Sequence, residues 1–284
     1  MRSKGRKTEY AGGTEVSHAY PVFLSLRITS PDPKAVIQRD DILWMSSLFS
    51  CRAIASFSPA ASYTGGLRVD FELLTIDGSG GGTGMSPNDM LDNWGVPSVL
   101  LHAKAHDYAF LRAAAGKKVV DLAVGGGLAK PSQAFKALAL GAPYVKAVCM
   151  SRSFMIPAFL GCNIEGALHP ERRERVHGAW SALPKTVLDI GDTPETIFAG
   201  YHALKERLGA DEMAHIPYGA IAMWTMCDRL GAGLQHHMAG ARKFGVEHID
   251  RTDICAANRE TAQETGIPFI TEQDDELARR IVLG

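Results

Sequence analysis

The fold is decided by the stretch VVDLAVGGGLAKPSQAFKALALGA at residues 119–142. Val119 to Val124 is an apolar run of strand length, and the three glycines Gly125 to Gly127 follow it directly. Pro131 then begins an apolar, helix-forming segment that ends at Gly141, since proline suits the first turn of a helix and glycine its end. The stretch therefore predicts a buried strand, a glycine loop and a helix.

The same unit is repeated on both sides of this stretch. Upstream, the strand-length run Leu73 to Ile76 precedes five glycines between Gly78 and Gly84, and a helix is expected from Pro97 to Ala115. Downstream, Tyr144 to Cys149 is a third apolar run, followed by Ser151 to Ser153. Alternating strands and helices require a parallel sheet with right-handed crossovers, so the predicted fold class is α/β.

The remainder of the chain divides into two parts of different character. From Met1 to about residue 68 there is neither a helical period nor strand alternation. After Gly161 the pattern is helical, with helices expected from Thr193 to Gly209, over residues 219–243, and after caps at Thr252 and Thr271. We expect an irregular N-terminal segment (1–68), an α/β part (69–165) and a helical C-terminal extension (166–284).

The composition excludes several function classes. The chain has 284 residues, 46% of them hydrophobic and 21% charged, which is sufficient for a substantial core. Thirty basic and 31 acidic residues give a net charge of −1, so no nucleic-acid or anionic-membrane partner is expected. Lys146 and Arg152 interrupt the most hydrophobic region, and the five cysteines have no regular spacing. These features predict a protein without membrane spans or disulfides, located in the cytoplasm.

The loops that follow the strands are the candidate site, because the carboxyl ends of parallel strands share one edge of the sheet. The loops Gly125 to Leu128 and Met150 to Ser153 suit a phosphate, since glycine amides and helix N-termini bind anions. Arg152 could add a bidentate cation. In (β/α)₈ barrels the commonest phosphate site lies after strands seven and eight. The alternative is that the glycines only form tight turns.

Three blocks of sequence carry a family resemblance in their order and spacing: LLTIDGSGGGTGMSP at Leu73–Pro87, GVPSVLLHAKAH at Gly95–His106 and the opening stretch at Val119–Ala142. Together they resemble the FMN-binding domain of glutamate synthases and of their stand-alone relatives. The resemblance implies the C-terminal half of a (β/α)₈ TIM-type barrel with a helical C-terminal extension. It also implies an FMN phosphate site at Gly126, Gly127, Ser151 and Arg152, and a substrate face lined by Asp77, Gly81, Gly82 and Thr83.

The implied chemistry is reduction of 2-iminoglutarate, formed from 2-oxoglutarate and ammonia, by reduced FMN. The implied partners are a small-molecule substrate and an electron-donor protein or subunit. No side chain is assigned a catalytic role by this resemblance. The flavin supplies the redox chemistry in such enzymes, and the protein supplies position and electrostatics.

Two departures from the family pattern are visible in the sequence. The family places three cysteines spaced C-x₅-C-x₄-C after the last strand to hold a 3Fe-4S cluster, whereas this chain has Cys162, Leu168 and Arg173 there. We therefore expect no cluster. About seventy residues precede the Leu73 strand, too few for five further βα units, so the chain looks truncated. A non-catalytic half barrel that retains a phosphate site, or a lyase or isomerase acting on a phosphorylated metabolite, stays open.

Other motifs predict structure more than chemistry. His102 and His106 are four residues apart, but Ala-Lys-Ala separates them, so we expect packing or hydrogen bonding and no metal site. Four of the cysteines lie in apolar or small-residue contexts typical of inert thiols: Cys149, Cys162, Cys227 and Cys255. The run PERRER at Pro170–Arg175 is expected to be a solvated helix face, with docking of an acidic partner as the alternative.

Overall fold

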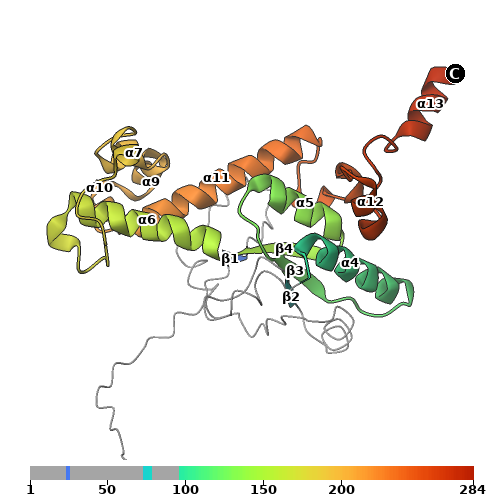
Figure 1. Cartoon of the computed structure of the whole chain (residues 1–284), viewed down its shortest axis with the longest axis horizontal. Coiled ribbons are helices and arrows are strands. Elements are labelled where there is room, and N and C mark those ends of the chain that lie inside the picture. Colours follow the sequence, from blue (N-terminus) through green and yellow to red (C-terminus); the bar gives the residue numbers. More distant parts are fainter. Residues whose placement is uncertain (1–23, 26–72, 79–95) are drawn as a thin grey trace, which may run out of the picture.

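The computed structural model describes residues 24–25, 73–78 and 96–284. Within them the chain alternates strand and helix as the apolar runs predict (Figure 1). The alternating part consists of β2 (Leu73–Asp77), α4 (Ser98–Ala114), β3 (Asp121–Gly125), α5 (Pro131–Gly141) and β4 (Val145–Met150). The α/β fold class is confirmed.

The sheet places the three predicted strands side by side and parallel. β3 lies between β2 and β4, with Asp77 opposite Gly125 and Val124 opposite Val148. At the outer edge of β4, the short strand β1 (Leu24–Ser25) pairs antiparallel. The prediction of neighbouring parallel strands is confirmed, and their carboxyl ends lie at one edge.

The middle strand begins later than its apolar run suggests. β3 starts at Asp121 and ends at Gly125, whereas the apolar run starts at Val119. Val120 precedes the strand and is only 6% exposed, because it packs in the core without joining the sheet ladder. The buried segment therefore begins earlier in the chain than the paired strand.

The main core forms between the sheet and its covering helices. Leu122 and Val124 of β3 are almost fully buried against α4 and α5. The long helix α11 (Tyr218–Gly240) lies along α5 and α6 (Arg152–Leu168), and contributes Leu230, Leu234 and Met238 to the same core (Figure 1). The helix-rich half of the chain is thus packed on the sheet-containing half, and the expected boundary at residue 165 falls inside α6.

Short helices follow α6, and some of them contribute to a second core, which consists of Ile164, Phe198, Leu204, Met213, Tyr218, Ile221 and Ala222. They are η1 (Pro170–Arg172), α7 (Lys185–Leu188), α8 (Pro194–Ile197), α9 (Tyr201–Leu208) and α10 (Ala210–Met213). The prediction of one continuous helix from Thr193 to Gly209 is wrong. Phe198 turns into the second core, and Gly200 lies so close to the Trp224 ring that an added Cβ would stand 2.6 Å from it, so the chain breaks between α8 and α9.

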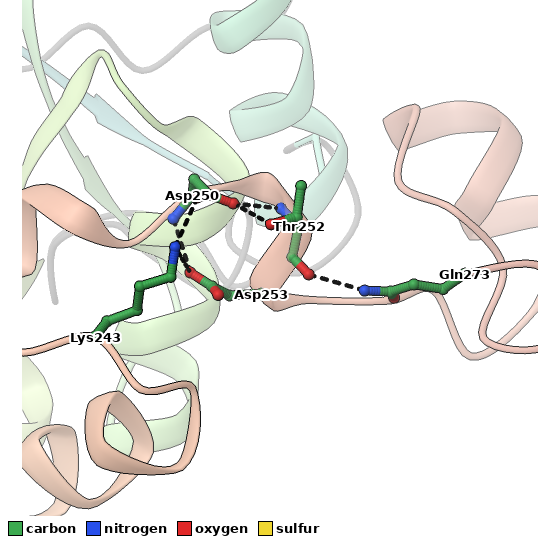
Figure 2. A network of polar contacts seen from close by, with 5 residues as sticks. All are labelled: Lys243, Asp250, Thr252, Asp253 and Gln273. Atoms are coloured by element: carbon green, nitrogen blue, oxygen red, sulfur yellow. Dashed lines mark hydrogen bonds and ion pairs between the residues drawn. The ribbon is translucent and has the colours of Figure 1, made fainter. Parts of the chain in front are cut away.

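The C-terminal part contains η2 (Val246–His248), η3 (Arg251–Asp253), α12 (Arg259–Thr265) and α13 (Asp275–Leu283). The expected cap at Thr252 is wrong, because Asp250 caps η3 and accepts the Thr252 N–H at 2.8 Å. The Lys243 ammonium lies 2.8 Å from Asp250 Oδ2, and the Gln273 side chain donates to the Thr252 carbonyl at 2.8 Å (Figure 2). The segment before α13 is thereby tied to η3. Across the described ranges, no helix is long and apolar enough to cross a bilayer.

Candidate functional site

Hydrogen bonds join the segments that follow the three parallel strands. The Gly78 N–H donates to the Gly125 carbonyl at 3.2 Å, connecting the ends of β2 and β3. The Ser153 hydroxyl donates to the Leu128 carbonyl at 3.2 Å, connecting the start of α6 to the loop after β3. The edge predicted to carry the site is therefore one connected structure. Gly81, Gly82 and Thr83 lie outside the described residues.

Two side chains of helix α4 form hydrogen bonds with the glycine loop that follows β3. The Ser98 hydroxyl donates to the Gly126 carbonyl at 2.9 Å, and His102 Nε2 lies 3.0 Å from the Gly125 carbonyl. His102 is 2% exposed, and burial lowers its pKa to about 4, so the ring is neutral and its Nε2–H donates. These two carbonyls are thus turned toward α4.

This orientation determines where the loop amides point. In a trans peptide the C=O of one residue and the N–H of the next point in opposite directions. With the Gly125 and Gly126 carbonyls facing α4, the N–H groups of Gly126 and Gly127 point away from it. Farther along the loop the amides of Ala129 and Lys130 are occupied, since the Gln133 side chain accepts from Ala129 N at 2.9 Å and from Lys130 N at 3.0 Å. The amides that this geometry directs away from α4 are those of Gly126 and Gly127.

The two glycines have different surroundings. Gly126 has φ +106°, and a Cβ there would stand 2.7 Å from the Gly78 carbonyl and also overlap Ser98. Gly127 has φ +71°, with no atom within 4 Å of an added Cβ. Position 126 must be glycine because neighbouring backbone fills the space beside its α-carbon. The group of Gly126 that can contact an anion is therefore its N–H. Gly127 presents an open face.

The loop after β4 places the N-terminus of α6 beside the glycine turn, which is formed by Gly126 and Gly127. Ser151 is the N-cap residue of α6, and its carbonyl accepts the Phe154 N–H at 3.0 Å. Arg152 is the first helical residue and is exposed. The start of a helix carries a partial positive charge, and a guanidinium adds a full one. Together with Gly127, these residues form an electropositive edge of the kind that binds phosphate.

Asp77 ends β2 at the same edge. Its Oδ1 atom lies 3.2 Å from the position that a Cβ on Gly125 would occupy, so the carboxylate rests against the start of the second loop. The structure thus brings together five of the eight residues predicted for the site. Asp77, Gly126, Gly127, Ser151 and Arg152 are the five.

The positions that hold a 3Fe-4S cluster in the family do not fit one here. Arg173 donates from Nε to the Gly166 carbonyl at 3.2 Å and from Nη2 to the Ser181 carbonyl at 3.4 Å. Leu168 packs against the second core, and burial raises the pKa of the Cys162 thiol, which disfavours the thiolate that a metal requires. One thiol beside an arginine and a leucine cannot replace three thiolates. The residues described contain no group of three or more His, Cys, Asp or Glu that could hold a metal.

Two further expectations are tested by the structure. The prediction that His102 and His106 serve packing and hydrogen bonding is confirmed, because His106 lies against the Phe110 and Tyr144 rings. The prediction of a solvated helix over PERRER is confirmed in part, because Pro170, Glu171, Glu174 and Arg175 are exposed. The helix is shorter than expected and covers only Pro170–Arg172. Arg172 lies 3.7 Å from Glu165, which is 1% exposed, so this one side chain is held against the protein.

The comparisons with known proteins concern the part of the chain that carries these loops. Residues 54–171 match the family model described as the conserved region in glutamate synthase. These residues are a glutamate synthase-like domain. The archaeal-type glutamate synthase (NADPH) of Dehalococcoides mccartyi is 31% identical over 115 residues, covering 40% of this chain and 22% of that protein. The chain thus spans about a fifth of the relative it matches. No solved structure matches significantly.

The glutamate synthase-like domain contains all five described site residues. It also contains Ser98 and His102, which sequence analysis did not connect with the glycine loop. Their spacing of four residues places both on one face of α4, directly after the first glycine-rich block. That spacing was the available signal. What it could not reveal is that the face points toward β3.

Proposed function

We propose that the glutamate synthase-like domain binds FMN and contributes to the reduction of 2-iminoglutarate, formed from 2-oxoglutarate and ammonia, to glutamate. The observation that carries the proposal is the glycine turn held by α4, with its amides directed away from that helix and the start of α6 beside it. The family match supports the same assignment. We place the reaction in the cytoplasm, and the four described cysteines are free thiols.

The proposal assigns a part to each of the site residues. The N–H groups of Gly126 and Gly127, the Ser151 region and the Arg152 guanidinium hold the phosphate of FMN. Asp77, with Gly81, Gly82 and Thr83, lines the substrate face. His102 and Ser98 keep the glycine turn in its binding conformation. When bound, FMN supplies the reducing equivalents for the imine carbon.

The fold and the electron supply complete the proposal. β2, β3 and β4 form the C-terminal part of a TIM-type barrel, and the helices after residue 165 form an extension packed on it. Because the Cys162, Leu168 and Arg173 positions do not fit a 3Fe-4S cluster, electrons reach the flavin from an electron-donor protein or subunit without that relay.

Comparing FMN with riboflavin tests the phosphate site, since the two share a ring and differ in the phosphate. Hydrogen bonds to charged groups contribute roughly 1.5–3 kcal/mol each, so losing several weakens binding by orders of magnitude. The full chain should therefore bind FMN far more tightly than riboflavin in fluorescence titrations at fixed salt. Arg152→Ala should weaken FMN binding and leave riboflavin binding unchanged.

Arg175→Ala is the matched control, because Arg175 is also exposed but lies beyond the far end of the 17-residue helix α6. It should leave both affinities unchanged. Equal affinity for the two flavins would overturn the phosphate site. If the chain bound a sugar phosphate and neither flavin, the lyase or isomerase alternative would replace the proposal. FMN binding without turnover in the presence of an electron donor would favour the non-catalytic half barrel.

A further inference from the structure

Helix α11 packs on both of the helices that begin at the proposed phosphate site. α6 follows the loop after β4, and α5 follows the loop that contains the glycine turn. α11 lies along both helices (Figure 1). Its residues Leu230 and Leu234 belong to the same core as Phe154 in the first turn of α6. A helix that lies beyond the family match, which ends at residue 171, therefore connects the two sides of the site.

The start of α11 has a fixed position on α6. An added Cβ at Gly161 would stand 2.6 Å from the α-carbon of Gly219, so the two backbones are in close contact at this crossing. The Tyr218 N–H also donates to the buried Glu165 carboxylate at 2.8 Å. Because a close-packed interior leaves no free space, a shift of this end of α11 would shift α6 with it.

Farther along, α11 meets the first residue of α5. A Cβ at Gly233 would overlap the Cγ atom of Pro131 and stand 2.7 Å from its Cβ atom. Carbon atoms in contact lie about 3.5–4.0 Å apart, so a methyl group at position 233 needs roughly 1 Å of additional space. At Gly231, in contrast, an added Cβ would have no atom within 4 Å. Close approach to α5 thus requires glycine at position 233 and not at position 231.

Pro131 is connected to the glycine turn by a short segment with little freedom to move. The Gln133 side chain accepts from the amides of the two residues before Pro131, at 2.9 and 3.0 Å, and so joins them to the first turn of α5. Leu128, which follows Gly127, packs against the main core. A displacement of Pro131 is therefore transmitted to the glycine turn. Since α11 is fixed on α6 at its other end, this displacement changes the distance between the glycine turn and the start of α6.

We propose that α11 sets the distance between the two sides of the phosphate site, and that Gly233 is the positioning residue that permits the correct distance. The glycine turn is one side, and the start of α6 with Arg152 is the other. Gly233 does not contact the phosphate in this proposal and acts through Pro131. The inference rests on the proposed FMN phosphate site and adds its regulation by a helix from outside the glutamate synthase-like domain. Linkage makes the effect reciprocal, so a phosphate bound to both sides holds α11 in place.

Gly233→Ala tests the spacing, and Gly231→Ala is the matched control on the same helix. Both variants add one methyl group and raise helix propensity equally, but only the first crowds Pro131. A hydrogen bond lengthened to about 3.6 Å is lost, and losing one bond to a charged group weakens binding at least about tenfold. In fluorescence titrations of the full chain at fixed salt, Gly233→Ala should weaken FMN binding at least about tenfold relative to riboflavin binding. Gly231→Ala should leave the ratio of the two affinities unchanged.

A second substitution distinguishes a change of spacing from a general loss of packing. In the double variant Pro131→Gly, Gly233→Ala, the added methyl group meets no proline ring. Its ratio of FMN to riboflavin affinity should therefore equal that of Pro131→Gly alone, as a double-mutant cycle measures. General loosening of the structure would instead weaken both flavins alike and would not be reversed by the second change.

Hydrogen exchange of the unaltered protein tests the reciprocal effect without a variant. Saturating FMN should slow exchange of the α11 amides around Gly233 more than saturating riboflavin does. Circular dichroism at the titration temperature establishes whether the variants are folded, and the exchange result decides the matter if Gly233→Ala is not. Equal binding of both flavins by the unaltered protein would overturn the phosphate site and this inference with it. If the unaltered protein prefers FMN, an unchanged affinity ratio in folded Gly233→Ala, or equal exchange with the two flavins, would overturn only the role of α11.

Discussion

The buried histidine behind the glycine turn should make stability depend on pH in a way that one substitution removes. The pKa of His102 is lowered from 6.5 to about 4 by burial, so between these values the unfolded chain binds a proton that the native state does not. Stability is therefore greatest above pH 6.5 and falls as the pH drops toward 4. The loss attributable to His102 over this range is roughly 3 kcal/mol.

His102→Phe keeps an aromatic ring of similar size and removes both the proton site and the hydrogen bond. At pH 7 the variant should be less stable than the unaltered protein by about 1 kcal/mol, the usual net value of one hydrogen bond. The loss is not larger because the Gly125 carbonyl keeps its 3.2 Å bond from Gly78. At pH 4 the order should reverse, with the variant about 2 kcal/mol more stable.

Urea unfolding from pH 4 to 7.5 measures both curves, followed by fluorescence and circular dichroism. The control His236→Phe changes an exposed histidine of α11 in the same way and should leave the pH dependence intact. The carboxylates that titrate in acid are common to all three proteins, so their contribution cancels when the free energies of unfolding of two proteins are subtracted. Parallel curves for the unaltered protein and His102→Phe, without a crossing between pH 4 and 7, would refute the assignment of a neutral, donating His102.

Three further outcomes are expected. Gly126→Ala should lower the melting temperature much more than Gly127→Ala, because only the first Cβ meets neighbouring backbone, at 2.7 Å; equal losses in thermal melts would contradict this. Glu165→Ala should reduce the free energy of unfolding by about 1–3 kcal/mol, since it leaves a buried α11 amide without its 2.8 Å acceptor, and an unchanged urea midpoint would argue against that contact. Asp250→Asn should cause a small, salt-sensitive loss: the lysine ammonium and a neighbouring threonine lower the Asp250 pKa from 3.8 to about 2, so the contribution is present above pH 3.8 and disappears toward pH 2, which acid titration of both proteins checks.

The regular part of the fold could be predicted because its signals are local. Leu73 to Ile76 is an apolar run flanked by Glu72 and Asp77, and Tyr144 to Cys149 is a largely apolar run that begins after Pro143. Both strands lie within one residue of these runs. Pro131 and Gly141 mark α5 for the same reason. Where tertiary contacts compete with local preference, prediction failed. Thr193 to Gly209 has a good helical pattern, but burial of Phe198 breaks it.

The same contrast between local signals and tertiary contacts applies to the candidate site. Gly126, Gly127 and Arg152 could be found from the loop position alone, because parallel strands bring their carboxyl ends together. The different surroundings of the two glycines could not be predicted, because they depend on Gly78 and Ser98, which pack from other elements. A sequence shows which residues follow a strand, but not which contacts are made behind them.

The placement of α11 has a consequence for anyone who wishes to isolate the glutamate synthase-like domain. The family match ends at residue 171, yet the core above the sheet is completed by Leu230, Leu234 and Met238. A fragment cut at the end of the match would expose the apolar surface that α11 covers on α5. The unit of sequence relationship is therefore smaller than the unit of folding. Expression of the matched region alone should yield aggregated protein, whereas a fragment that extends through α11 retains the covering helix.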